Sequence, residues 1–241
     1  AQTIQCLNNM KQLELAWHLY ADDHEDRITP NYPGQDAGKY TGMASWVSGW
    51  MTYETSAIDA PWYSQSTNTL LLIPGGYGSI ARYTKNPGIY KCPADKSWIM
   101  INGARSGRVR SVAMNGFMDS LWPWGDTVVC VFRKTTDIIA PSASQTWVFI
   151  DQHEDSIEDG RFEVELAGPT SPWVPHFWAE LPSSRHNGAV TLSFADGHAE
   201  IKKWLDPRTR QPVTRTRYIP VIEENPDAAW LQERSSCFKS Q

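Results

Sequence analysis

The sequence predicts an α+β fold, and three observations support this prediction. An apolar stripe with helical spacing runs through residues 3–24, short β-rich segments recur over residues 109–204, and residues 30–88 are irregular and rich in Gly, Pro, Ser, Tyr and Trp. A lone amphipathic helix needs a sheet or a second helix to cover its apolar side. We therefore expect a single domain, residues 1–241, in which the N-terminal helix packs on an antiparallel β-sheet and residues 30–88 form a large irregular insertion.

The N-terminal segment has the clearest helical pattern in the chain. Its apolar residues follow one another at steps of four and three, which places them on one helical face. These residues are Cys6, Met10, Leu13, Trp17 and Tyr20. The helix is expected to end before Pro30, because proline cannot continue it.

The second half of the chain contains short segments that are expected to be strands. They are Val109–Met114, Val128–Phe132, Thr146–Ile150 and Arg161–Leu166. Asp159-Gly160 is a candidate hairpin turn between the last two. Residues 205–241 are rich in proline and charge, and this tail is expected to wrap the surface.

Residues 189–204 predict a β-hairpin. Apolar and polar residues alternate on either side of Asp196-Gly197, a dipeptide typical of two-residue turns in which both residues have positive φ. This turn gives one apolar and one polar side, with opposite pairs Ala195–His198, Phe194–Ala199, Leu192–Ile201, Ser193–Glu200 and Thr191–Lys202.

Composition limits the classes of function. The chain of 241 residues has a net charge of −5, whereas a nucleic-acid-binding domain normally has a basic patch, so no nucleic-acid partner is expected. No apolar run approaches the roughly 20 residues of a membrane span. The 12 Trp residues exclude a disordered chain and predict either an aromatic core or a surface on which rings stack.

Four cysteines, Cys6, Cys92, Cys130 and Cys237, are far apart in the sequence and form no Cys-x-x-Cys motif. Four cysteines allow three complete pairings, and the sequence does not choose among them. They are expected either to be buried free thiols or to form one or two disulfides in an oxidising compartment.

An acidic segment offers candidate metal ligands. Asp151, His153 and Asp155 alternate, so they would share one face of an extended segment, and Asp159 follows them. Such carboxylates could hold calcium, although the spacing is not that of an EF-hand. The alternative is a solvated acidic turn between two strands.

His186 and Asp196 are ten residues apart, which corresponds to about 33 Å along an extended strand. They are therefore expected at opposite ends of the hairpin, with His186 in contact with Asp206 and Asp196 forming the turn. A hydrolase that uses His176 or His186 is a further hypothesis, but no nucleophile motif accompanies either histidine.

Several Trp residues lie in segments expected to be loops. Trp122, Trp124, Trp173 and Trp178 are candidates for a platform on which a sugar stacks. The alternative, which we favour, is that the Trp residues fill an irregular core.

Five segments carry motifs that occur in a fixed order, followed by His186, nine residues and Asp196-Gly197. These segments are Cys6–Leu13, Tyr20–Asp23, Tyr90–Asp95, Ser111–Gly116 and Phe149–Gly160. In this order they resemble type IV pilin-like proteins, in particular prepilin-type proteins with a His-x9-Asp-Gly motif in the C-terminal half. The resemblance runs from residue 4 to about residue 208.

The resemblance implies a pseudopilin-like subunit with a pilin-like fold. In such proteins a prepilin peptidase removes a short leader, an apolar helix anchors the subunit in the inner membrane and packs in the filament core, and the head lies in the periplasm. Residues 1–26 would be the C-terminal half of that helix, and its apolar half would precede Ala1. Some pseudopilin heads bind calcium through carboxylates of a late loop, for which Asp151, Asp155 and Asp159 are the candidates here.

The resulting prediction is a non-enzymatic subunit of a type II secretion or type IV pilus-like assembly in the bacterial cell envelope. Its partners would be other pilin-like subunits, the inner membrane through the helix expected upstream, and secreted cargo or a glycan. No cofactor is required, and calcium is the one candidate ligand ion. The alternative is an envelope carbohydrate- or calcium-binding module, and the third hypothesis is an envelope hydrolase.

Overall fold

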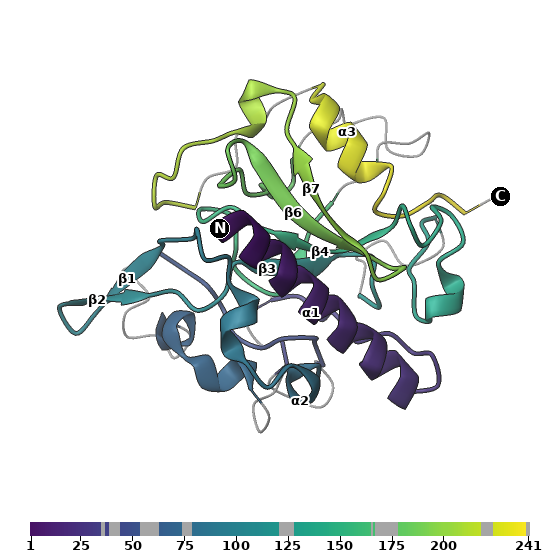
Figure 1. Cartoon of the computed structure of the whole chain (residues 1–241), viewed down its shortest axis with the longest axis horizontal. Coiled ribbons are helices and arrows are strands. Elements are labelled where there is room, and N and C mark those ends of the chain that lie inside the picture. Colours follow the sequence, from purple (N-terminus) through teal and green to yellow (C-terminus); the bar gives the residue numbers. More distant parts are fainter. Residues whose placement is uncertain are drawn as a thin grey trace.

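A five-stranded sheet with a long helix lying across it forms the centre of the molecule (Figure 1). The computed structural model describes residues 1–34, 37–38, 44–53, 63–73, 79–120, 128–164, 166, 178–217 and 224–239. The strand order of the main sheet is β5-β3-β4-β6-β7, and β1 and β2 form a separate hairpin. Neighbouring strands of the main sheet are antiparallel except β3 and β5, which are parallel. The α+β class with an N-terminal helix is therefore confirmed, and the sheet is mixed at one edge.

The elements are short except for the first helix. The helices are α1 (Gln2–Asp23), α2 (Ala81–Thr84) and α3 (Pro226–Gln232), with 3₁₀ turns at Tyr63–Thr67, Thr69–Leu72, Pro87–Tyr90, Thr135–Asp137 and Pro207–Thr209. The strands are β1 (Trp98–Ile101), β2 (Ala104–Gly107), β3 (Val112–Asn115), β4 (Trp147–Asp151), β5 (Arg161–Phe162), β6 (Ala189–Phe194) and β7 (Ala199–Lys203).

Helix α1 has two different sides. The predicted stripe packs on the sheet, mainly on β6, and Met10, Leu13 and Trp17 are fully buried there. The outer side carries Ile4 and Leu15, which are 57% and 59% exposed. No described helix combines the length and the apolarity that a membrane span requires. The prediction of a helix that packs on the sheet is confirmed.

The hairpin β6–β7 forms as predicted, but the predicted register is wrong by one residue. Thr191 lies opposite Ile201 and Leu192 lies opposite Glu200. The reason is the turn: only Gly197 of the dipeptide has positive φ, and its N–H bonds to the carbonyl of Phe194. This is a three-residue loop, in which a single residue needs the left-handed conformation, rather than the predicted two-residue turn.

One strand prediction and one turn prediction also need correction. Val128–Phe132 is not a strand but makes two isolated bridges, through Val129 and Phe132. Asp159-Gly160 does not form a hairpin, because β5 pairs with β3 instead of with β4. Gly160 lies against Trp46, and a Cβ on this glycine would come within 2.7 Å of the indole nitrogen.

The hairpin β1–β2 was not predicted, although its signal was present. Asn102 and Gly103 connect the strands, and both have positive φ, as a two-residue hairpin turn requires. Helix α3 was also not predicted; Asn225 caps it by accepting hydrogen bonds from the N–H groups of Asp227 and Ala228.

The segment expected to be an insertion contributes to the central core. Trp46, Val47, Leu72 and Ile80 belong to the same buried cluster as α1 and the sheet. Residues 205–241, which were expected to wrap the surface, also contribute to the core, since Leu231 of α3 is fully buried. Among the described residues, the indoles of Trp17, Trp46, Trp147 and Trp204 are fully buried, so these four Trp residues fill the core.

The four cysteines form one disulfide and leave two free thiols. Cys130 and Cys237 form a disulfide across a sequence separation of 107 residues and tie the tail to the bridge at Val129. Cys6 and Cys92 are buried free thiols.

Candidate functional site

The two free thiols meet a histidine and a carboxylate beneath the first turns of α1. We call this group, Cys6, Cys92, Asp151 and His186, the thiol–histidine cluster. One side-chain donor atom from each residue lies within 4.8 Å of those of all the others. All four residues are buried, with exposures between 0% and 8%. They come from α1, the turn after the 3₁₀ helix Pro87–Tyr90, the end of β4 and the turn before β6.

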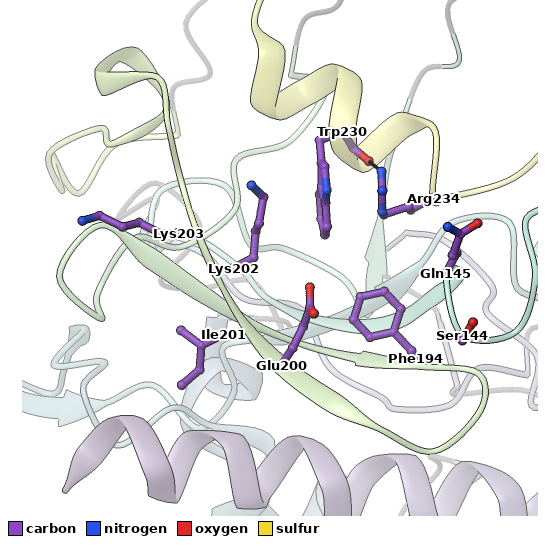
Figure 2. Close-up of a pocket in the computed structure, with 9 residues that line it drawn as sticks. All are labelled: Ser144, Gln145, Phe194, Glu200, Ile201, Lys202, Lys203, Trp230 and Arg234. Atoms are coloured by element: carbon purple, nitrogen blue, oxygen red, sulfur yellow. Dashed lines mark hydrogen bonds between the residues drawn. The ribbon is translucent and has the colours of Figure 1, made fainter.

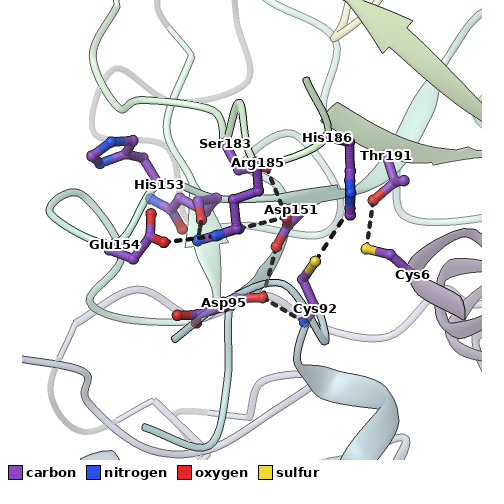
Figure 3. A network of polar contacts seen from close by, with 12 residues as sticks. Cys6, Cys92, Asp95, Asp151, His153, Glu154, Ser183, Arg185, His186 and Thr191 are labelled. Carbon is purple, nitrogen blue, oxygen red and sulfur yellow. Dashed lines mark hydrogen bonds and ion pairs between the residues drawn. The ribbon is translucent and has the colours of Figure 1, made fainter. Parts of the chain in front are cut away.

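Hydrogen bonds fix the orientation of the sulfur and imidazole groups (Figure 3). His186 directs Nε2 toward the Cys92 sulfur at 3.2 Å, while its Nδ1 lies 3.3 Å from the Thr3 hydroxyl. The Cys6 sulfur lies 3.0 Å from the hydroxyl of Thr191 on β6. Two contacts therefore join the start of α1 to the region around the start of β6: Thr3 with His186, and Cys6 with Thr191.

Asp151 is held by a buried polar network. Its carboxylate accepts hydrogen bonds from the hydroxyls of Ser111, at 2.6 Å, and Ser183, at 2.7 Å. The guanidinium of Arg185 also binds it, and the same guanidinium binds Glu154 at 2.8 Å. The side chain of Arg185 is only 7% exposed, so its positive charge acts in a site with little water.

The contacts shift the pKa values of the cluster in opposite directions. The close approach of the two thiols raises the pKa of Cys6 and lowers that of Cys92. Burial opposes the shift of Cys92, whereas His186 and Arg185 favour its thiolate. The hydrogen bond to Cys92 raises the pKa of His186. Burial raises the pKa of Asp151 to about 7, although Arg185 favours its ionised form. The contacts therefore favour the thiolate form of Cys92 and the protonated form of His186.

Thiolate, imidazole and carboxylate groups are the side chains that bind transition metals, and here they converge on one point. The cluster lies between the helix and the sheet, which favours a role in holding an ion or a charge over one in binding a large substrate.

The acidic segment is not gathered into one ligand set. Of its four candidates only Asp151 belongs to the thiol–histidine cluster, which is the one such group found among the described residues. His153 lies 3.0 Å from the carbonyl of Gln211. The carboxylate of Asp155 accepts the N–H groups of residues 214 and 215, and that of Asp159 accepts those of residues 34 and 161.

The reason is that the segment is not extended beyond Gln152. The N–H groups of Ser156 and Ile157 both bond to the carbonyl of His153, which forms a turn and separates the alternating side chains. The segment is also not a solvated turn, because Asp151, Asp155 and Asp159 are at most 7% exposed.

The two ends of the His-x9-Asp-Gly motif lie at opposite ends of β6, as the strand length indicated. His186 precedes the strand and Asp196 lies in the turn after it, where Asp196 binds His198 at 2.5 Å. The expected contact between His186 and Asp206 does not form. His186 instead contacts Cys92 and Thr3, and Asp206 binds Arg208. His176 lies outside the described residues.

The candidate stacking residues divide into two groups. Trp122, Trp124 and Trp173 lie outside the described residues. Trp178 is 3% exposed and meets Trp204 edge to face, so it belongs to the core.

An open hollow beside β7 does expose a Trp ring, that of Trp230 on α3 (Figure 2). The amine of Lys202 and the guanidinium of Arg234 lie 4.9 Å and 4.4 Å from the centre of this ring. Because these cations already occupy the ring, it does not form a free platform for a sugar.

The sequence did not predict that the free thiols of Cys6 and Cys92 lie close together, nor that Arg185 binds Asp151. The one signal was that both cysteines lie in segments that carry the pilin-like resemblance. In comparisons with protein-family models, with curated proteins and with solved structures, the chain has no match.

Proposed function

We propose that the chain is the globular head of a pilin-like filament subunit, which contacts its sibling subunits through α1. The observation that carries this proposal is the second apolar stripe of α1. Ile4, Leu15 and Leu19 are 57%, 59% and 39% exposed, and their spacing of eleven and four residues places them on one side of the helix. A helix of a solitary globular domain normally presents polar residues on its outer side.

The occupant that fits this stripe is α1 of a neighbouring subunit. The exposed apolar side chains run along one side of the helix, where Asn8 and Lys11 are exposed between Ile4 and Leu15, so the proposed helix pair has both apolar and polar contacts. The inner side of α1 is held to the sheet by buried apolar residues and by the contacts of Cys6 and Thr3, so the helix offers a firm surface. Contacts of this kind need no catalytic group.

The proposed location is the periplasmic side of the bacterial inner membrane. The Cys130–Cys237 disulfide supports an oxidising compartment. The order of motifs from Cys6 to Gly197 supports the pilin-like identity and, with it, a type II secretion or type IV pilus-like assembly.

The proposal can be tested with charged substitutions in the full-length protein in its own cells. Leu15→Asp is expected to abolish incorporation into sedimentable filaments, because it places a charge in the helix contact. Ile139→Asp is the matched control, since Ile139 is 79% exposed and lies far from α1 in the sequence; it is expected to assemble normally. Equal assembly of both variants would contradict the proposal.

The coding sequence before Ala1 gives a second test. The proposal predicts a short basic leader and about 20 apolar residues directly upstream. A catalytic domain in that place would overturn it.

A further inference from the structure

The thiol–histidine cluster contains more donor groups than a pair of thiols needs. A disulfide between Cys6 and Cys92 would use both sulfur atoms, but it would leave the imidazole of His186 and the carboxylate of Asp151 aimed at it from buried positions. Buried polar groups are costly unless they have partners. Asp151 keeps its contacts with Ser111, Ser183 and Arg185 in either case, but Nε2 of His186 would lose the Cys92 thiol as its partner. A single cation between the four residues would use all four donor groups at once.

We propose that the cluster is a structural zinc site, with Cys6, Cys92, His186 and Asp151 as its four protein ligands. Zinc prefers thiolate, imidazole and carboxylate ligands, and structural zinc sites are closed and tetrahedral. Ligand atoms at about 2.0–2.3 Å from a tetrahedral ion lie roughly 3.3–3.8 Å from one another. The four donors are within 4.8 Å of one another, so a small inward movement completes the geometry.

The surrounding residues match the partners that orient metal ligands. His186 faces the site with Nε2 while Nδ1 meets the hydroxyl of Thr3, which fixes the imidazole ring. The hydroxyls of Ser111 and Ser183 orient the carboxylate of Asp151. The N–H group of Cys92 also binds Ser111, at 2.9 Å, so one side chain positions two of the ligands.

Charge balance also favours a divalent ion. Two thiolates and one carboxylate around Zn²⁺ leave one net negative charge, and the buried guanidinium of Arg185, which Asp151 shares with Glu154, reduces its cost. The donor set is unsuited to calcium, which takes six to eight oxygen ligands.

The ion would join four segments that are far apart in the sequence. Cys6 lies in the second turn of α1, and the other ligands belong to the body of the head. Zinc would therefore lock the start of α1 to the sheet. This role goes beyond the proposed filament contact, which concerns the outer side of the same helix and does not depend on a metal.

The experiment uses the protein without an affinity tag, reduced and treated with chelator under anaerobic conditions, and then titrated with zinc. Elemental analysis after gel filtration is expected to find one zinc per chain, with a higher melting temperature than the chelated protein. Cys92→Ser and His186→Ala are expected to lose the retained zinc. His198→Ala is the matched control, because His198 lies on the β6–β7 turn and binds Asp196, and it is expected to retain one zinc.

A second readout does not depend on how well the variants fold. Cobalt added to the chelated wild-type protein is expected to give the near-ultraviolet charge-transfer absorption of thiolate ligands and the intense visible bands of a tetrahedral ion. Failure of the reduced wild-type protein to retain zinc, or octahedral cobalt without thiolate absorption, would overturn the proposal. A Cys6–Cys92 disulfide mapped in protein isolated from its native cells would also overturn it.

Discussion

The two sides of strand β6 are equally buried but chemically different. On the side covered by α1, Thr191 meets the sulfur of Cys6, and Ser193 donates a hydrogen bond of 2.5 Å to the carboxylate of Glu14. On the opposite side, Leu192 and Phe194 are apolar and at most 2% exposed. Phe194 lies opposite Trp147, whose indole N–H bonds to Ser235 just after α3.

The difference shows that burial alone does not say what stabilises a side of the sheet. The apolar side is stabilised by removal of surface from water, at about 25 cal/mol per Å². The side beneath α1 combines buried apolar residues of the helix with buried polar contacts, and removal of one polar partner leaves another group buried and unpaired. The side beneath α1 also carries the thiol–histidine cluster and anchors the helix proposed to contact other subunits.

Removal of Arg185 should have the largest effect on the side beneath α1. Arg185→Met leaves the carboxylates of Asp151 and Glu154 buried without their cation, and we expect a loss of about 3–5 kcal/mol in the free energy of unfolding. Urea denaturation measures this loss. The double variant Arg185→Met/Asp151→Asn should recover part of it, because one of the two charges is removed. A cost below about 1 kcal/mol for the single variant would mean that the network does not stabilise this side.

A pair of nearly isosteric exchanges compares the two sides directly. Val190→Thr places a hydroxyl in the buried apolar cluster and should cost about 1–3 kcal/mol, the cost of burying an unpaired polar group. Thr191→Val removes the hydrogen-bond partner of the Cys6 thiol, which is a weak donor and acceptor, and should cost about 0.5–1.5 kcal/mol. The melting temperatures of both variants show which exchange costs more stability. The comparison fails if Thr191→Val is the more costly exchange.

Glu14 should make stability depend on pH. Burial raises its pKa well above the usual value, and Asp196 adds to the shift, whereas the hydrogen bond from Ser193 opposes it. A raised carboxyl pKa contributes stability that is complete below the ordinary value of about 4.3 and is lost as the pH rises through the folded-state pKa. His18, whose ring nitrogen lies 3.6 Å from Glu14, has a pKa lowered by burial and is a weak counter-ion at neutral pH.

Glu14→Gln should therefore flatten the pH dependence and stabilise the protein at pH 7 by roughly 1 kcal/mol, the scale of the cost of a buried unpaired polar group. Melting temperatures between pH 4 and pH 8 test this expectation. A variant that is less stable than the wild type at pH 7 and equally sensitive to pH would show that Glu14 is ionised and well paired.

The sequence predicted the elements whose patterns are local. The stripe from Cys6 to Trp17 repeats with the helical period, and the alternation on either side of Asp196-Gly197 located the hairpin. The register was missed because an Asp-Gly dipeptide suits both a two-residue turn and a three-residue loop, and only the backbone conformation of Asp196 distinguishes them.

Local sequence patterns could not predict the thiol–histidine cluster. Its residues lie in four distant segments, and their meeting depends on how α1 crosses β6. The alternation in the sequence predicts a polar side for Thr191 and Ser193, and in a simple hairpin that side faces water. In the structure α1 covers them, because the helix presents Cys6 and Glu14 as polar partners within its buried stripe.

The most direct test of the division between the two sides of β6 is the zinc-induced change in melting temperature of three proteins: wild type, Leu192→Ala and Cys92→Ser. Leu192→Ala should lose about 2–5 kcal/mol of stability with or without metal, because it opens a cavity on the apolar side, yet keep the full zinc-induced rise of the wild type. Cys92→Ser should lose the zinc-induced rise. The account is contradicted if Cys92→Ser keeps the rise, or if Leu192→Ala, while still folded, loses it.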